Sequence, residues 1–148
     1  MTAAIRPYQR VDKEACLALF DGNVPRYFDA SERTAFDGFL DLPRGEYFTL
    51  LWQNRVAGCG GFSLTDEGFA RFTWGMVDQA LHGKGLGKMM TEYRLEAIAK
   101  SGEYSGIELS TTPMIAPFFH KFGFVDQGLE KNGFAPGMDL VRMSKTLD

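Results

Sequence analysis

The chain has 148 residues, of which 45% are hydrophobic and 24% charged, and its formal net charge at pH 7 is −3. These values exclude an intrinsically disordered chain, the length predicts one domain over residues 1–148, and the acidic balance argues against a nucleic-acid partner. No apolar run has membrane-spanning length and no leader-like segment opens the chain, so we expect a cytoplasmic protein with no membrane partner.

The first 43 residues predict one strand and two helices. Residues 4–8 are typical of a short strand, and residues 12–23 of a helix that Asp12 is placed to cap. A second helix is expected over residues 31–43, with Ser31 at its cap. Each helix has one apolar face: Cys16, Leu19 and Phe20 in the first, and Phe36, Phe39 and Leu40 in the second.

From residue 46 onward the apolar pattern changes to a period of two, which is typical of strands. Three antiparallel strands are expected in succession, over residues 46–52, 55–64 and 69–77, with turns at residues 53–54 and 66–68. The third strand alternates two sets of side chains, Phe72, Trp74 and Met76 on one face and Arg71, Thr73 and Gly75 on the other.

After residue 80 the pattern alternates between helices and strands. A long helix follows a glycine-rich segment; next come a strand over residues 106–111, a short helix or turn over 114–124, and strands over 125–133 and 139–147. The apolar positions of the long helix are Leu86, Met90, Tyr93 and Ala97, and its solvent-facing positions are Glu92, Glu96 and Lys100. This order of elements predicts a mixed α/β fold with a partly antiparallel sheet.

Three glycines, Gly83, Gly85 and Gly87, fall within five residues at the start of the long helix, with Lys84 and Lys88 after the first and the last of them. The first N–H groups of a helix have no partner within it, and the helix dipole makes that end partly positive. Bare glycines let an anion approach these donors, so the segment predicts an anion-binding turn. The alternative is a turn in which glycine serves close packing alone.

Two common phosphate-binding motifs fit this segment poorly. The loop of nucleoside-triphosphate-binding proteins requires Gly-Lys followed by Ser or Thr, and neither hydroxyl residue follows here. A dinucleotide fingerprint requires GxGxxG within a parallel βαβ unit, whereas this segment contains GxGxG and follows three antiparallel strands.

The segment instead resembles the pyrophosphate loop of the GNAT family of N-acetyltransferases, in which (Arg/Gln)-x-x-Gly-x-(Gly/Ala) opens a long helix. The matching residues are His82-Gly83-Lys84-Gly85-Leu86-Gly87. The family's second signature, Tyr-x-Lys-x-Gly-Phe, is similar to Phe119-His120-Lys121-Phe122-Gly123-Phe124. With the shared order of elements, the resemblance implies the family's fold: a mixed, mostly antiparallel central sheet flanked by helices, with splayed strands 4 and 5.

The resemblance also implies acetyl-CoA as a co-substrate and no metal. The main chain of Met76 and Val77 would hydrogen-bond the pantetheine arm, and the amides from Gly83 to Lys88 would hold the pyrophosphate. The cofactor-binding residues implied in this way are Met76, Val77, His82, Gly83, Lys84, Gly85, Leu86, Gly87, Lys88 and Phe119.

Three positions depart from the family's pattern. His82 stands where Arg or Gln is usual, and Pro113 stands where many members have an Asn that contacts the coenzyme. Phe119 replaces the tyrosine that commonly protonates the departing thiolate, and a phenyl ring has no proton to donate.

Acetyl transfer to an amine needs a group that removes a proton, and Glu108 and His120 are the catalytic candidates. Glu108 would act as a base, directly or through water, or it is a solvent-facing strand residue. His120 would replace the missing acid beside Phe119, or it is a solvated surface residue.

The amine is expected to enter between the first two helices and the loop that joins the last two strands. Aromatic and acidic side chains there suit a cationic amine: Tyr27, Phe28, Asp29 and Glu32. Core and surface roles explain the same four residues, and we prefer that interpretation. The hydroxyls of Ser110, Thr111 and Thr112 would orient the amine or a water, or they are ordinary strand-end groups.

The sequence thus predicts an acyl-CoA-dependent N-acyltransferase that moves an acetyl group from acetyl-CoA to a primary amine by direct attack. The acceptor is a small molecule or a protein amine, and members of the family often form homodimers. The alternative is a catalytically weak or inactive acyl-CoA-binding or regulatory domain on the same fold. A third hypothesis is a binder of nucleotide phosphates unrelated to coenzyme A.

Overall fold

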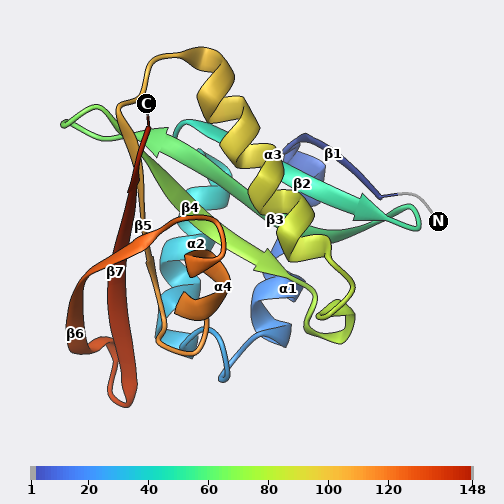
Figure 1. The fold of residues 1–148 in the computed structure, drawn as a ribbon. Helices are drawn as coiled ribbons and strands as arrows, with labels where there is room; N and C mark the ends of the chain where they lie inside the picture. The colour runs from blue at the N-terminus through green and yellow to red at the C-terminus, as the bar shows by residue number, and fades with distance from the viewer. Residues whose placement is uncertain (1–2, 148) are drawn as a thin grey trace.

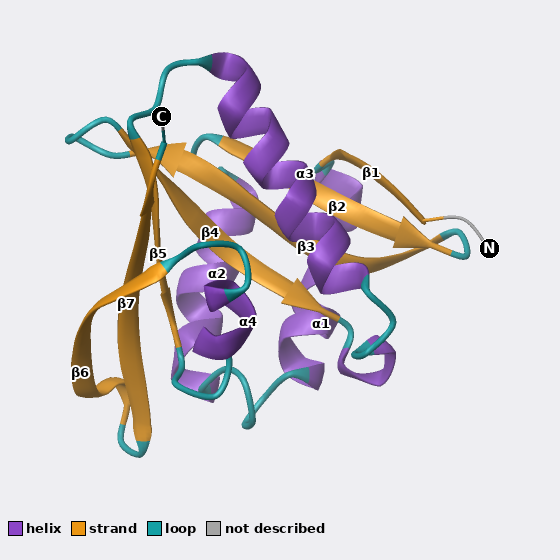
Figure 2. Ribbon diagram, in the orientation of Figure 1, coloured by secondary structure: helices purple, strands orange, loops and turns teal. Residues whose placement is uncertain are grey.

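The computed structural model describes residues 3–147, which form a seven-stranded sheet with helices on both faces (Figure 1 and Figure 2). The strands are β1 (Ala3–Pro7), β2 (Glu46–Trp52), β3 (Arg55–Leu64), β4 (Phe69–Val77), β5 (Gly106–Thr111), β6 (Val125–Ala135) and β7 (Met138–Thr146). The helices are α1 (Lys13–Gly22), α2 (Arg33–Asp41), α3 (Leu86–Ser101) and α4 (Ala116–His120). Three short 3-10 turns are η1 (Arg10–Asp12), η2 (Ala30–Glu32) and η3 (Gln79–Leu81).

The strand order is β1-β2-β3-β4-β5-β7-β6, and each neighbouring pair is antiparallel except β4 and β5, which are parallel. Helices α1 and α2 pack on one face of the sheet, and α3 and α4 pack on the other. This mixed, mostly antiparallel sheet flanked by helices confirms the predicted architecture. No helix among residues 3–147 is long and apolar enough to cross a membrane.

The bounds of β2, β3, β4 and β5 agree with the predicted strands, whereas β1 and β7 each lie one residue earlier. The hairpin turn between β2 and β3 explains part of this agreement. Gln53 and Asn54 have φ values of 52° and 62°, the left-handed conformation that the favoured two-residue hairpin turn requires at both positions.

A β-bulge in β4 changes the face on which its side chains lie. Two residues, Trp74 and Gly75, stand opposite the single residue Gly60 of β3, and Trp74 has a positive φ of 37°. Phe72 therefore packs on the side of α3 and α4, while Trp74 and Met76 pack with α1 and α2. The prediction that Phe72, Trp74 and Met76 share one face is wrong, because the extra residue shifts the alternation by one.

The inner face of α3 also differs from the prediction after its second turn. Leu86 and Met90 are buried as predicted, but Tyr93 is 37% exposed, and the next buried positions are Arg94 and Ile98. The prediction chose Tyr93 over Arg94 for the inner face because charged side chains usually face solvent. Arg94 is an exception to that rule.

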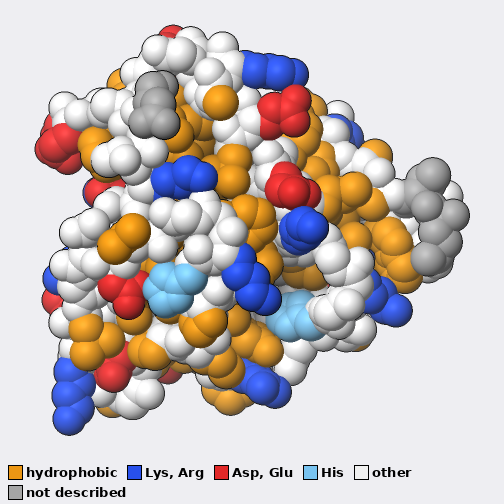
Figure 3. Space-filling view, in the orientation of Figure 1, with side chains coloured by type: hydrophobic (Ala, Val, Ile, Leu, Met, Phe, Trp, Pro, Cys, Tyr) orange, Lys and Arg blue, Asp and Glu red, His pale blue; other side chains and the backbone are white. Residues whose placement is uncertain are grey.

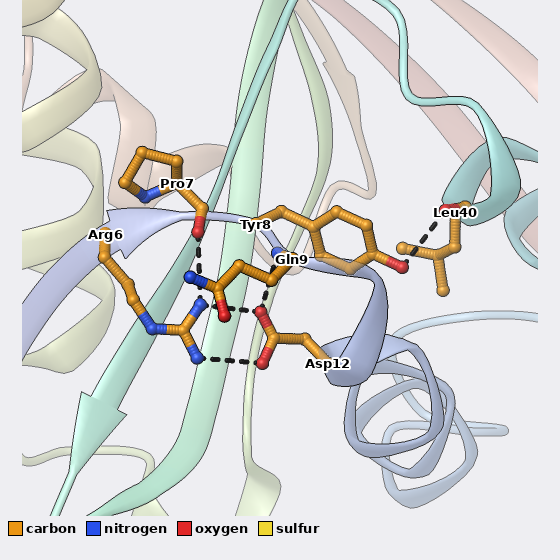
Figure 4. A network of polar contacts seen from close by, with 6 residues as sticks. All are labelled: Arg6, Pro7, Tyr8, Gln9, Asp12 and Leu40. Carbon is orange, nitrogen blue, oxygen red and sulfur yellow. Dashed lines mark hydrogen bonds and ion pairs between the residues drawn. The ribbon is translucent and has the colours of Figure 1, made fainter.

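A 3-10 turn precedes both α1 and α2 and alters their predicted caps. Asp12 stands at the N-cap position of α1 but makes no side-chain capping bond there, and the prediction of Ser31 at the cap of α2 is wrong. The carboxylate of Asp12 caps nothing in α1; it accepts hydrogen bonds from the Arg6 guanidinium at 2.7 and 2.9 Å and from the Gln9 amide at 2.8 Å (Figure 4). Before α2, the capping residue is Asp29, whose carboxylate accepts from the Ser31 amide at 2.9 Å.

The Arg6–Asp12 pair ties β1 to the start of α1. Asp12 is 4% exposed, and the hydrogen bonds from Arg6 lower the pKa of its carboxyl group. Next to the pair, the Tyr8 hydroxyl donates to the Leu40 carbonyl at 3.0 Å, which fixes the end of α2 to the same corner (Figure 4). This network therefore anchors both helices of one face to the edge of the sheet.

Asp12→Asn should lower the free energy of unfolding at pH 7 by about 1–3 kcal/mol, because Arg6 loses a charged acceptor. Since the folded-state pKa of Asp12 lies below its unfolded value, its contribution is present above the unfolded pKa and is lost as the pH falls through the folded one. Urea unfolding of the two proteins should therefore converge below about pH 4. Asp21→Asn, in the exposed pair with Arg33, is the control and should cost about 0.5 kcal/mol or less; equal losses at the two sites would contradict the assignment.

Candidate active site

The sheet opens between β4 and β5 (Figure 2). Their parallel pairing covers only Phe69–Arg71 and Gly106–Glu108, so the remainder of β4 has no partner on this side among the described residues. A cleft of about 720 Å³ lies in the opening, lined by β4, β5, α4 and the start of α3. This volume is within the range of small-molecule sites, about 300–1,000 Å³.

The glycine segment enters α3 through two left-handed residues. Gly83 has a φ of 85° and Gly85, the N-cap of α3, a φ of 83°. A Cβ atom built at either position would meet no other atom within 4 Å. Close packing therefore does not explain these glycines; the backbone conformation does, and it leaves open space in front of the helix.

The first turn of α3 presents free N–H groups to the cleft. The Met89 amide donates to the Gly85 carbonyl at 3.0 Å as the first bond of the helix. The amides of Leu86, Gly87 and Lys88 precede that bond and have no acceptor within the helix. All three residues line the cleft, so the donors and the positive end of the helix dipole face the space that an anion would fill.

Basic side chains gather over the start of α3 and over α4 (Figure 3). Lys88 lines the cleft. The Nζ atom of Lys84 instead lies 6.0 Å from the ring centroid of Trp52, outside the lining. The structure therefore brings Lys88, and not Lys84, to the mouth of the site.

His82 joins the glycine segment to the end of β4. Its Nε2 lies 3.0 Å from the carbonyl oxygen of Val77, and the Asn23 side-chain amide donates to the same oxygen at 3.0 Å. The imidazole also meets the ring of Tyr27 edge-on at 5.0 Å. All of these residues line the cleft together with Met76. Sequence reasoning missed Asn23, because a single polar residue after a helix carries no distinguishing pattern.

Phe119 lies in an aromatic wall of the cleft. On α4, its ring centroid is 6.3 Å from that of Phe72, 5.1 Å from that of Phe118 and 5.7 Å from that of Phe124. Phe119 thus lines the cleft and presents a purely apolar surface to it.

Glu108 and His120 lie outside the lining of the cleft. The Glu108 carboxylate accepts from the Arg71 guanidinium at 2.9 and 2.6 Å, at the last paired position of β4 and β5. His120 is exposed, and its Nε2 lies 2.8 Å from the Asp126 carboxylate. The structure therefore gives Glu108 an ion-pair partner and His120 a neighbouring carboxylate, and it does not bring Glu108 and His120 together.

Several residues for which the sequence allowed either a site role or a structural one line the cleft: Tyr27, Phe28, Glu32, Ser110, Thr111 and Thr112. Glu32 is half-buried on η2, where its carboxylate accepts from the Asp29 amide at 2.9 Å. Burial raises the pKa of this carboxyl group above its usual value. A carboxylate with a raised pKa in a cleft is suited to accept a proton.

Two threonines that line the cleft have buried side-chain hydroxyls. The Oγ1 atoms of Thr73 and Thr112 have no hydrogen-bond partner among residues 3–147. A buried hydroxyl without a partner is costly, so these atoms are suited to bind a polar ligand. In the same part of the chain, no group of His, Cys, Asp or Glu side chains is arranged to hold a metal.

A domain model described as acetyltransferase (GNAT) matches residues 21–147, which is most of the chain. The chain belongs to the GNAT acetyltransferase family. Among curated proteins, none matches the sequence.

Solved structures share the GNAT fold. The ribosomal-protein-S18-alanine N-acetyltransferase from Escherichia coli has a TM-score of 0.83 at 15% identity, over 99% of this chain and 95% of that one. An aminoglycoside 6′-N-acetyltransferase complexed with coenzyme A has a TM-score of 0.77 at 15% identity, over 97% and 96%. YncA from Salmonella typhimurium, with its cofactor acetyl-CoA, has a TM-score of 0.76 at 18% identity, over 100% and 95%. At these identities the likeness shows the fold.

In this GNAT domain, Gly85→Ala and Gly87→Ala should change stability in opposite directions. Alanine at Gly85 must adopt a positive φ of 83°, which costs about 1–2 kcal/mol. Alanine at Gly87 lies in the first turn of α3 with its nearest contact at 3.7 Å, and should add about 0.5–1 kcal/mol. Unfolding in guanidinium chloride measures both changes, and a shared sign would contradict the backbone described for this segment.

Proposed function

We propose that this protein transfers an acetyl group from acetyl-CoA to a primary amine by direct attack. The observation that carries the proposal is a single cleft in which the unpaired edge of β4 meets the glycine-flanked start of α3. Membership of the GNAT family supports acetyltransferase activity. The neighbouring structures that contain coenzyme A or acetyl-CoA support the choice of donor.

The start of α3 fits the pyrophosphate of coenzyme A. Open space in front of Gly83 and Gly85 admits the group, and the free amides of Leu86 to Lys88 would donate to its oxygens. The Lys88 ammonium group would add a positive charge. His82 would help to position the glycine segment beside the end of β4, because its ring contacts the carbonyl oxygen of Val77.

The unpaired edge of β4 fits an extended arm such as pantetheine. Between residues 72 and 77 the main chain of β4 has no β5 partner, and Met76 and Val77 line the cleft there. An extended ligand adds to such an edge through main-chain hydrogen bonds. The buried hydroxyls of Thr73 and Thr112 would supply further polar contacts on the two walls.

Bound acetyl-CoA would supply an acyl carbon that an amine nitrogen attacks, with the thiolate as the leaving group. The protein's own part is to position the amine and to take its proton. We assign proton removal to Glu32, whose carboxylate lines the cleft and has a raised pKa. Glu108 and His120, the earlier candidates, would first have to leave Arg71 and Asp126.

The acceptor amine, of a small molecule or a protein, would approach from the side of α1 and α2. Tyr27, Phe28 and Glu32 line the cleft on that side and combine two aromatic rings with one carboxylate. Such a set suits a cationic amine, because the ring faces and the carboxylate both attract positive charge. The same carboxylate would then lower the charge of the amine by accepting its proton.

Gly85→Val should abolish the binding of coenzyme A, because a side chain at residue 85 would enter the space in front of α3. Gly102→Val is the matched control at the opposite end of the same helix, where Gly102 also has a positive φ, of 67°, and no neighbour within 4 Å. Both variants carry similar backbone strain, so only the position relative to the cleft differs. Isothermal titration with coenzyme A measures the outcome; equal affinities of the two variants would contradict the assigned phosphate site.

Transfer itself is measured by the release of free coenzyme A thiol from acetyl-CoA with a panel of primary amines. We expect release that depends on the amine and is lost in Gly85→Val. Binding of acetyl-CoA without release on any amine would favour the alternative of a regulatory domain. Stabilisation by ATP or NAD that exceeds stabilisation by acetyl-CoA would favour the third hypothesis.

Phe119→Tyr should raise kcat by about tenfold or more, because general acid catalysis of the departing thiolate contributes typically 10²–10⁴-fold. Phe118→Tyr is the control. Phe118 also lines the cleft, and this substitution adds the same hydroxyl to the neighbouring ring. Steady-state kinetics with one amine compare the two variants. An unchanged kcat in Phe119→Tyr would mean that thiolate departure does not limit turnover.

A further inference from the structure

Arg94 is a buried cation at the cleft that the function described above does not use. The residue is 4% exposed, lies on the third turn of α3 and lines the cleft. Its guanidinium donates one long hydrogen bond, from Nη1 to the Gly61 carbonyl at 3.3 Å, and its Nε has no partner. Among residues 3–147, no carboxylate forms an ion pair with it.

The surrounding backbone holds the guanidinium in one place. Its Cζ lies 3.8 Å from the ring centroid of Phe72, which covers one side of the group. A Cβ at Gly75 would lie 3.1 Å from Nη2, and a Cβ at Gly60 would lie 3.3 Å from Cζ and Nη1. The glycines opposite each other at the β-bulge therefore make the room that Arg94 fills, and the donors are pre-positioned beside the cleft.

A guanidinium buried without a carboxylate partner is not explained by a need for stability. Taking a charge out of water is costly unless a partner neutralises it, and an apolar side chain of similar length is often at least as stable. Burial lowers the pKa of Arg94 to about 10, so the group still carries its charge at pH 7. A role in binding a ligand therefore explains a charged residue at this buried position better than a role in stabilising the fold.

The phosphate site does not use this charge, because it is too far along the helix. Eight residues separate Arg94 from Leu86, the first residue of α3, which corresponds to about 12 Å at 1.5 Å per residue. The ring of Phe72 lies against Arg94, and Phe119, whose ring centroid is 6.3 Å from that of Phe72, also lines the cleft. A second anionic group that reached this region would find Arg94 as its cationic partner.

We propose that Arg94 binds a carboxylate of a substrate in the cleft, so that the protein prefers substrates carrying one over neutral counterparts. A planar guanidinium matches a carboxylate through paired hydrogen bonds, and the match is strongest where water is excluded. The carboxylate belongs either to the acyl group, as in a dicarboxylic acyl-CoA, or to an amino-acid acceptor. This inference rests on the proposed function and names the substrate class of the same cleft.

Two pairs of ligands show whether the carboxylate belongs to the acyl group or to the acceptor. The acyl pair is succinyl-CoA against acetyl-CoA, and the acceptor pair is each amino acid of a panel against the amine left by its decarboxylation. Calorimetric affinities and kcat/KM are measured for the wild type, Arg94→Met, Arg94→Lys and the surface control Arg33→Met. In the wild type and in Arg33→Met, we expect the affinity and kcat/KM within one pair to be tenfold or more higher for the ligand that carries the carboxylate. Arg94→Met should reduce that difference to less than twofold, and Arg94→Lys should retain part of it.

Equal affinities within both pairs in the wild type would overturn the inference, as would a preference that persists in Arg94→Met. Arg94→Met should unfold at the same temperature as the wild type or higher, because it removes an unpaired charge. A clearly lower Tm together with an unchanged preference would show a purely structural role and overturn the inference. Failure of the proposed function has a different signature, since the wild type would then bind neither acetyl-CoA nor succinyl-CoA.

Discussion

The end of the parallel pairing between β4 and β5 is the constraint on which the other features depend. The two strands pair over three residues each and stop at Arg71 and Glu108, whose side chains form an ion pair at 2.6 Å. Beyond that point one edge of β4 stays unpaired, and the bulge at Trp74 and Gly75 turns its side chains. The sheet thus holds together at one end and opens a cleft at the other, where the start of α3 arrives.

The costs of this arrangement are concentrated around the cleft. Two left-handed glycines, Gly83 and Gly85, line it, as do two threonines with unsatisfied hydroxyls and Arg94, which is buried without a carboxylate partner among residues 3–147. Elsewhere the two faces of the sheet carry well-buried apolar clusters, with Phe20 and Phe36 fully covered on one face and Ile98 and Ile107 on the other. Packing on both faces therefore offsets the unfavourable groups that a ligand site requires.

Local patterns explain what the sequence could predict. The strands β2 to β5 follow from a period of two broken by turn residues, and the turn into α3 follows from the glycines that precede that helix. Tertiary contacts decide the features that the sequence could not predict. Glu108 is held by Arg71, 37 residues away in the chain, and the face of Trp74 depends on a bulge that alternation cannot reveal. Arg94 escaped notice because a charge on a helix usually indicates a solvated face, and here the glycines of two strands make room for it.

The hydrogen bonds at the end of β4 have a consequence for the edge of the sheet. A carbonyl oxygen has two lone pairs, and those of Val77 already face Asn23 and His82 at 3.0 Å each. Asn23 donates to this oxygen, and the Nε2 tautomer of His82 would supply a second donor, so little room remains there for another hydrogen-bond donor. The side chains of Asn23 and His82 thus take the place that a neighbouring strand would have at the last carbonyl of β4.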